Sequence, residues 1–178
     1  NEGDRLFVRP KMVGTYLLPK LDADMTLILT STGTGVAPHM TMLETCVDTC
    51  KQVVMMECVR YSAELAYAEQ IRQFQQTHPN LVYISLVTRE GGAKRYIQDY
   101  FRDGILEKEH GVSIAPETTH VFACGNPAMI GIPKEGRKTG ALSYDTPGGL
   151  VEMLTTRYGL TIHKPVSYTH LTLPTSRS

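Results

Sequence analysis

The chain has 178 residues, enough for one domain with a core that can fold alone. Hydrophobic residues make up 42% and charged residues 20% of the sequence, as in an ordinary soluble globular protein. Lysine plus arginine and aspartate plus glutamate each number 18, and this zero formal net charge gives no indication of a nucleic-acid-binding or membrane-binding surface.

The cysteines give a first expectation about the compartment and about metals. Cys46, Cys50, Cys58 and Cys124 form no C-x-x-C pair, and no nearby histidine completes a metal-binding set. We therefore expect a reducing compartment, the cytoplasm, and no metal site.

Strand-like and helix-like segments alternate along the chain. Four nearly continuous apolar runs have the length and β-branched content of strands covered on both faces: Met25–Thr30, Val53–Val59, Leu81–Val87 and His120–Cys124. The helix-like segments are Pro38–Thr49, Ala63–Gln76, Tyr96–Glu107 and Gly149–Arg157, and a last short strand is expected at Leu160–His163. This pattern predicts an α/β fold with a doubly wound five-stranded parallel sheet in the order 3-2-1-4-5.

Two segments depart from the alternation. Asp4–Leu18 reads as a short β segment with a turn at Met12–Gly14, and we expect it to close a preceding β domain. The chain starts at Asn1, without Met and without a signal peptide, as an internal fragment would. Gly131–Gly149 is rich in Gly, Pro and Lys and is expected to form a long loop.

A glycine-containing segment directly follows the first predicted strand. It reads Thr30-Ser31-Thr32-Gly33-Thr34-Gly35-Val36-Ala37-Pro38. Glycines let the backbone turn tightly and approach a phosphate, and the next helix offers free N–H groups and its positive dipole end. Pro38 stands where the usual fingerprint has its third glycine, so this is not the standard dehydrogenase pattern. A tight turn without a ligand is the alternative.

Four motifs in this order resemble ferredoxin–NADP reductases. They are Ser31–Pro38, Val87-Thr88-Arg89-Glu90, Lys94-Arg95-Tyr96-Ile97-Gln98 and Cys124-Gly125-Asn126-Pro127-Ala128-Met129. The resemblance runs from about Gly3 to Pro165. It implies the NADP(H)-binding domain of a flavoenzyme, in which hydride passes between nicotinamide and FAD and electrons pass to or from ferredoxin or flavodoxin. The cofactor-binding residues that it implies in the first motif are Thr32, Gly33, Thr34, Gly35, Val36, Ala37 and Pro38.

Three cationic residues stand at strand ends, where the ligand crevice of a doubly wound sheet lies. Arg60 ends the second strand, Arg89 ends the third, and Lys94 follows closely. A 2′-phosphate needs such fork-shaped and point-charge donors. The resemblance assigns Arg89, Lys94 and Tyr96 to the adenosine 2′-phosphate, with Tyr96 also covering the adenine, and it matches Arg60 to an arginine of bacterial members. Solvated surface charges are the alternative reading.

One acidic residue offers a competing interpretation of the nucleotide. Glu57 could bind the ribose of NAD, but it lies inside the strand, before Arg60.

Cys124 is the candidate catalytic residue. The resemblance places its thiol beside the nicotinamide, where it would position the ring for hydride transfer and not attack it. Gly125 would allow the close approach, and Thr88, Asn126 and Met129 are assigned to the same cofactor, although Met129 could be plain core. An inert buried cysteine at a strand end is the alternative.

The resemblance also divides the chain. We expect residues 1–20 to be the end of an FAD-binding β-barrel domain, residues 21–165 the NADP(H)-binding domain, and residues 166–178 a non-native tail that reads like a translated sequencing adapter. The Arg-x-Tyr-Ser motif with which the family binds FAD is absent from the sequence, and so is the family's terminal aromatic residue. The fragment alone is therefore expected to be inactive.

Three functions remain open on the sequence. The first is the NADP(H) half of an oxidoreductase that passes electrons between NADPH and ferredoxin or flavodoxin. The second is a reductase of the same superfamily with another acceptor, as in oxygenase reductases or cytochrome b5 reductase-like proteins, many of which prefer NADH. The third is a nucleotide-binding module without redox activity. None of them includes a nucleic acid or a membrane as partner.

Overall fold

The computed structural model describes residues 16–92, 94–136, 141–144, 148–162 and 170–173, together with Gly3 and Arg5. Most of the β segment expected at Asp4–Leu18 therefore lies outside the described residues, and Tyr16–Leu18 have no regular secondary structure. The predicted remnant of a barrel domain stays a prediction.

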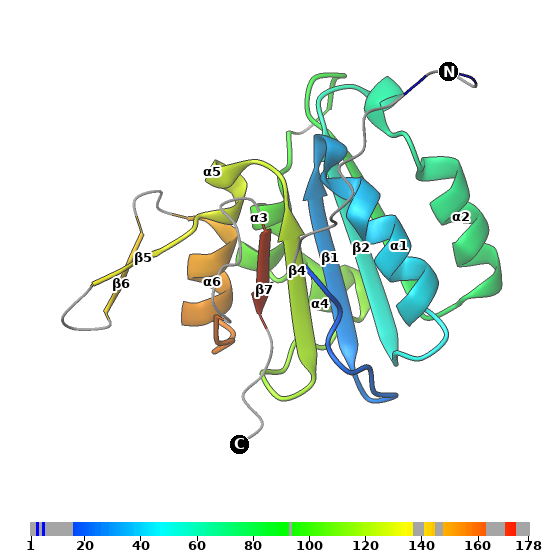
Figure 1. The fold of residues 1–178 in the computed structure, drawn as a ribbon. Coiled ribbons are helices and arrows are strands. Elements are labelled where there is room, and N and C mark those ends of the chain that lie inside the picture. Colours follow the sequence, from blue (N-terminus) through cyan, green and yellow to red (C-terminus); the bar gives the residue numbers. More distant parts are fainter. Residues whose placement is uncertain are drawn as a thin grey trace.

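Four parallel strands form the centre of the molecule (Figure 1). Their spatial order is β3-β2-β1-β4, and they span Thr26–Thr32 (β1), Gln52–Val59 (β2), Leu81–Val87 (β3) and Thr119–Cys124 (β4). In register, Ser31 lies between Glu57 of β2 and Cys124 of β4, so the carboxyl ends of the strands share one edge of the sheet. The predicted parallel α/β core is confirmed.

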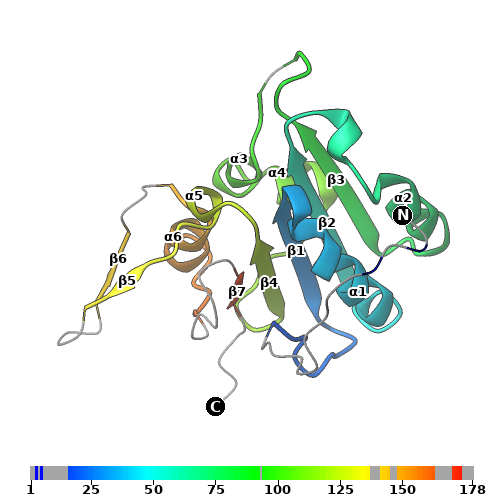
Figure 2. The ribbon, with the colours of Figure 1, turned by 45° about the horizontal axis from the view of Figure 1, so that its top comes forward.

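Helices cover both faces of this sheet (Figure 2). One face packs against α1 (Val36–Cys46) and α2 (Ala68–Thr77), and the other against α3 (Ile97–Arg102), α4 (Ile105–His110) and α6 (Leu150–Thr156). Side chains alternate between faces along a strand, so each interior strand contributes side chains to two hydrophobic cores, one on each face. This is why the central strands are continuously apolar and not alternating.

Two expected elements are subdivided in the structure. The helix expected at Tyr96–Glu107 breaks into α3 and α4, because Gly104 between them adopts the left-handed conformation with φ of 65°. The loop expected at Gly131–Gly149 contains a small antiparallel pair, β5 (Lys134–Glu135) and β6 (Leu142–Ser143), which projects away from the sheet (Figure 1). It follows the one-turn helix α5 (Pro127–Ile130).

The prediction of a fifth parallel strand at Leu160–His163 is not confirmed. Residues 160–162 form no strand, and His163 lies outside the described residues. The edge position beside β4 belongs instead to β7 (His170–Leu173), which runs antiparallel to it. Gly159, at φ of 69°, turns the chain after α6, and the Leu160 N–H bonds to the Leu154 carbonyl, so Leu160 is buried in the core beside α6.

The strand β7 also bears on residues 166–178. The sequence pattern gave this tail no partner, yet four of its residues pair with Val121–Cys124 through the backbone. The adapter origin of the tail stays a prediction.

In the part of the chain that the structure describes, no helix combines the length and the apolarity that crossing a bilayer requires.

Candidate functional site

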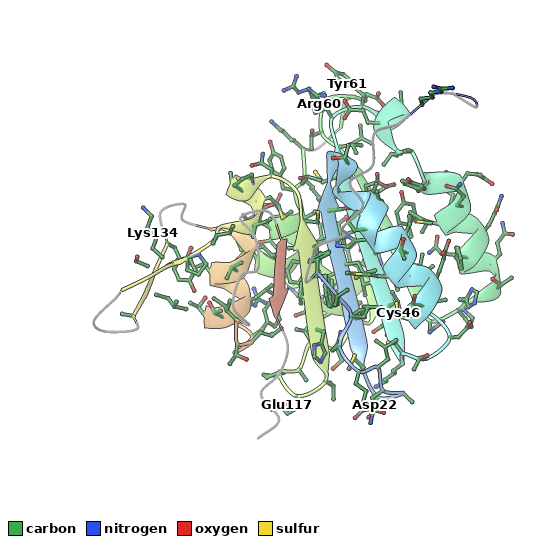
Figure 3. All side chains as sticks on the ribbon, viewed as in Figure 1. Asp22, Cys46, Arg60, Tyr61, Glu117 and Lys134 are labelled. Carbon is green, nitrogen blue, oxygen red and sulfur yellow. The ribbon has the colours of Figure 1, made fainter. Side chains whose placement is uncertain are left out.

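A cleft of about 1340 Å³ opens at the carboxyl ends of the parallel strands, the end where Figure 3 labels Arg60 and Tyr61. Every residue predicted from the sequence to bind the cofactor or to act in catalysis lines this cleft. These are Thr32, Gly33, Thr34, Gly35, Val36, Ala37, Pro38, Arg60, Thr88, Arg89, Lys94, Tyr96, Cys124, Gly125, Asn126 and Met129. Residues far apart in sequence, such as Thr32 and Asn126 at 94 positions, are thus brought to one concave surface, the place where open α/β sheets bind ligands.

The loops after β1 and β4 interlock at the floor of the cleft. Gly35 packs directly on Cys124: a Cβ at position 35 would overlap the Cys124 carbonyl oxygen and lie 2.8 Å from its carbonyl carbon. Gly125, at φ of 142°, packs in the same way on Thr32. The Asn126 N–H donates a 2.7 Å hydrogen bond to Thr32 Oγ1 and joins the two loops.

Gly33 has a different environment from these two glycines. It adopts φ of 54°, and a Cβ at this position would have no atom within 4 Å. It is exposed at the start of a 3₁₀ turn (Gly33–Gly35) that leads into α1. Gly33 therefore presents bare backbone to the cleft, whereas Gly35 and Gly125 let the two loops touch.

A backbone ladder places two arginines side by side at the far end of the cleft. Beyond the last paired residues of β2 and β3, the Thr88 N–H bonds to the Val59 carbonyl at 3.0 Å and the Arg89 N–H to the Arg60 carbonyl at 2.9 Å. The Ser62 N–H also donates to the Glu90 carboxylate at 2.9 Å. The two strand-end loops are therefore one tied unit that carries both guanidinium groups.

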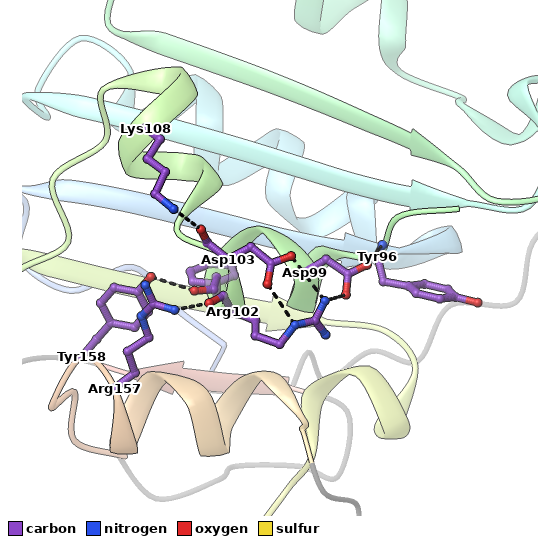
Figure 4. A network of polar contacts seen from close by, with 8 residues as sticks. Tyr96, Asp99, Arg102, Asp103, Lys108, Arg157 and Tyr158 are labelled. Atoms are coloured by element: carbon purple, nitrogen blue, oxygen red, sulfur yellow. Dashed lines mark hydrogen bonds and ion pairs between the residues drawn. The ribbon is translucent and has the colours of Figure 1, made fainter. Parts of the chain in front are cut away.

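Tyr96 and Lys94 complete this cationic end. Tyr96 caps α3, since its N–H donates to Asp99 Oδ2 at 2.7 Å, and Asp99 Oδ1 accepts from Arg102 at 2.6 Å. Figure 4 shows the Tyr96 ring projecting away from this network. The Lys94 ammonium lies over the ring, 5.2 Å from its centroid. The main chain of Tyr96 is thus held by the helix cap, while its exposed ring carries the Lys94 cation on one face.

Cys124 lies at the opposite end of the cleft, at the carboxyl end of β4. It is 7% exposed, and burial raises the pKa of its thiol. A neutral thiol is a poor nucleophile, so this environment suits packing against a ligand and not attack on one.

Comparison with known proteins assigns this architecture to a family. Residues 29–135 match the family model described as an oxidoreductase NAD-binding domain. The chain belongs to this family. A flavodoxin/ferredoxin–NADP reductase of Buchnera aphidicola is 31% identical over 134 residues, covering 72% of this chain and 52% of the relative. A ferredoxin–NADP reductase of Pseudomonas aeruginosa is 33% identical over 141 residues, covering 72% and 55%.

The resemblance to ferredoxin–NADP reductases predicted from the motifs is confirmed by these oxidoreductases. The chain spans about half the length of the curated relatives that it matches. A crystal structure of a ferredoxin NADP+ reductase from Neisseria gonorrhoeae with bound FAD and NADP shares the fold, with a TM-score of 0.65 and 19% identity. That match covers 88% of this chain and 58% of the other.

Glu57, the alternative ribose ligand, is not on the surface of this NAD-binding domain's cleft. It is fully buried in β2 and accepts a 2.9 Å hydrogen bond from the Tyr83 hydroxyl. Burial raises its pKa, and the Tyr83 bond lowers it by a smaller amount. This position removes Glu57 from contact with a bound ribose.

Sequence reasoning missed a buried polar pair behind the glycine loop. His39 follows Pro38 in α1 and is fully buried, and its Nε2 lies 2.6 Å from the hydroxyl of Tyr16. The Tyr16 ring also packs edge-on against Phe122 of β4, with centroids 5.5 Å apart. The pair ties the segment before the NAD-binding domain to the helix that follows its loop. A histidine directly after the glycine motif was the available signal in the sequence, but its partner, Tyr16, lies 23 positions away.

A second missed residue is Glu64, which lines the cleft beside the cations. Its carboxylate accepts hydrogen bonds from both the backbone N–H and the guanidinium of Arg60, four positions earlier. The available signal in the sequence was the spacing of four positions between Arg60 and Glu64. Glu64 was expected to lie in a helix from Ala63, but it ends the 3₁₀ turn Ser62–Glu64. The described residues contain no group of histidine, cysteine or acidic side chains that could hold a metal, and all four cysteines are free and buried.

The Thr32–Asn126 bond gives a first testable prediction. Replacing Thr32 with valine keeps the shape but removes the acceptor for the Asn126 N–H, and we expect a loss of about 1 kcal/mol of unfolding free energy. Urea unfolding measures the change. Thr32→Ser, which retains the hydroxyl, is the control; equal losses in both variants would contradict a role for this bond.

Proposed function

We propose that the chain is the NADP(H)-binding half of a flavin-dependent oxidoreductase that transfers electrons between NADPH and ferredoxin or flavodoxin. The observation that supports it best is the cationic end of the cleft, where Arg60, Arg89 and Lys94 meet on two tied loops. NADPH differs from NADH only by a 2′-phosphate, and such donors suit that group. Family membership supplies the redox context.

The cleft has a feature to fit each part of the dinucleotide. The bare backbone at Gly33 and the N-terminus of α1 would hold the pyrophosphate. Arg89, Lys94 and Arg60 would bind the 2′-phosphate, and the free face of the Tyr96 ring would cover the adenine. The nicotinamide would then lie toward the β4 end of the cleft, beside Cys124.

Cys124 would act by position. Its thiol is buried and its pKa is raised, so it stays neutral and packs against the nicotinamide without reacting. Its carbonyl and Sγ lie against Gly35, so the glycine loop fixes where the thiol stands. FAD, when bound in the whole enzyme, supplies the group that exchanges hydride with the nicotinamide; this chain binds and orients the dinucleotide for that step.

The division of the chain and its location follow from the same proposal. Residues 1–20 would end the FAD-binding domain, residues 21–165 would form the NADP(H)-binding domain, and residues 166–178 would be foreign to the family. The relatives named as flavodoxin/ferredoxin reductases favour those two proteins as partners over other acceptors. Four free cysteines agree with the reducing conditions of the cytoplasm.

The experiment that tests the proposal is a calorimetric titration of the purified chain with NADP+ and with NAD+. We expect NADP+ to bind at least about tenfold more tightly, because charge-assisted bonds to one phosphate contribute on the order of 1.5–3 kcal/mol each before screening. Equal affinities would contradict the assignment of the cationic end to a 2′-phosphate.

A further inference from the structure

A carboxylate lies among the cations of the cleft. Glu64 ends the 3₁₀ turn Ser62–Glu64 that follows Arg60, and it lines the same cleft. Its Oε2 accepts the Arg60 backbone N–H at 3.0 Å, and its Oε1 accepts Arg60 Nη2 at 2.8 Å and Nε at 3.2 Å. One edge of the Arg60 guanidinium is thus occupied by an internal anion.

The other two cations are not engaged in this way. In the described part of the chain, neither Arg89 nor Lys94 forms an ion pair, and the Lys94 ammonium lies over the Tyr96 ring. Glu64 is ionised at neutral pH, since hydrogen bonds from the Arg60 backbone and side chain lower its pKa. The pair stays accessible to a ligand, because 62% of the Arg60 side chain and 32% of the Glu64 side chain are exposed.

We propose that Glu64 is a selectivity-setting residue, whose carboxylate competes with the 2′-phosphate of the dinucleotide for Arg60. This inference rests on the proposed function and deepens it. Arg60 offers its Nε–Nη2 edge as a fork that fits one carboxylate or one phosphate, and Glu64 occupies that edge. A phosphate must either displace Glu64 or bind Arg60 beside a like charge. Glu64 therefore moderates the preference for NADPH over NADH.

The test is Glu64→Gln, titrated with 2′-phospho-AMP and with AMP, two probes that differ only in the 2′-phosphate. Glutamine keeps an oxygen that can accept the Arg60 backbone N–H, so the turn keeps its geometry while the charge is removed. We expect 2′-phospho-AMP to bind about three- to tenfold more tightly at low ionic strength and AMP to bind as before. Glu69→Gln, the same change at an exposed site on α2 outside the cleft, is the matched control and should leave both affinities unchanged.

A double-mutant cycle with Arg60→Ala tests the competition itself. Because Glu64 acts through Arg60, the gain from Glu64→Gln should largely disappear when Arg60 is alanine. An equal gain in that background would show a general charge effect and overturn the competition. Unchanged or weaker binding of 2′-phospho-AMP by Glu64→Gln would overturn it as well.

The outcomes separate this inference from the function on which it rests. If the wild-type chain binds 2′-phospho-AMP no better than AMP, the assignment of the phosphate site fails. If the wild type discriminates and Glu64→Gln discriminates equally, the phosphate site stands and only the role of Glu64 is wrong.

Discussion

Replacing Arg89 with alanine is expected to weaken binding of NADPH about tenfold or more and to leave binding of NADH nearly unchanged. Arg89 is exposed on the cleft, and no carboxylate pairs with it in the described part of the chain, so its guanidinium is free to bind a phosphate. Its backbone N–H donates a 2.9 Å hydrogen bond to the Arg60 carbonyl, which fixes the point where the side chain leaves the main chain. Fluorescence or calorimetric titration with each nucleotide measures the two affinities.

The chain offers a matched control for this substitution. Arg95 is also exposed and lies six positions on, but it does not line the cleft. Arg95→Ala removes the same charge from the protein, so it reports the general electrostatic contribution, which salt screens. Equal losses for NADPH and NADH in Arg89→Ala, or an equal loss of NADPH affinity in Arg95→Ala, would show that Arg89 does not recognise the 2′-phosphate.

The parallel core was predictable because a strand that is buried on both faces has a nearly continuous apolar sequence. Leu81–Val87 is a strand over the range expected, and the other three strands differ from expectation by two residues or fewer at either end. The break at Gly104 was missed because apolar residues continue on both sides of it, at Phe101 and Ile105, as in one helix. Whether a four-residue run such as Leu160–His163 forms a strand depends on a partner, which local sequence does not specify.

The site was predictable to the extent that it depends on topology. The carboxyl ends of parallel strands meet at one edge, so the motifs after β1, β2, β3 and β4 converge once the strands are assigned. Contacts between loops could not be predicted in this way. The Tyr16–His39 bond, the capture of Arg60 by Glu64 and the packing of Gly35 on Cys124 depend on side-chain and loop geometry.

The loop glycines yield the prediction with the largest effect on stability. A methyl group at position 35 would overlap the Cys124 carbonyl oxygen, a backbone atom that cannot move unless the β1 and β4 loops separate. We expect Gly35→Ala to cost about 3 kcal/mol of unfolding free energy, and a change of that size lowers Tm by about 6–12 °C in a domain of this length. Thermal unfolding followed by circular dichroism measures it, and a Tm equal to that of the wild type would contradict the close packing of these loops.

Gly33→Ala is the companion variant, and we expect the opposite pattern from it: a small loss of stability and a clear loss of NADP+ affinity. Its methyl group meets no protein atom within 4 Å, so the folding cost is limited to the left-handed backbone, about 1 kcal/mol. The same methyl group projects into space that the proposed pyrophosphate site requires, so NADP+ should bind more weakly to a chain that remains folded. If Gly33→Ala binds NADP+ like the wild type, the bare backbone at Gly33 does not contact the dinucleotide. If Gly33→Ala binds NADP+ weakly while Gly35→Ala mainly loses stability, the two glycines of one motif have different roles: Gly33 contacts the ligand, and Gly35 allows the loop to pack.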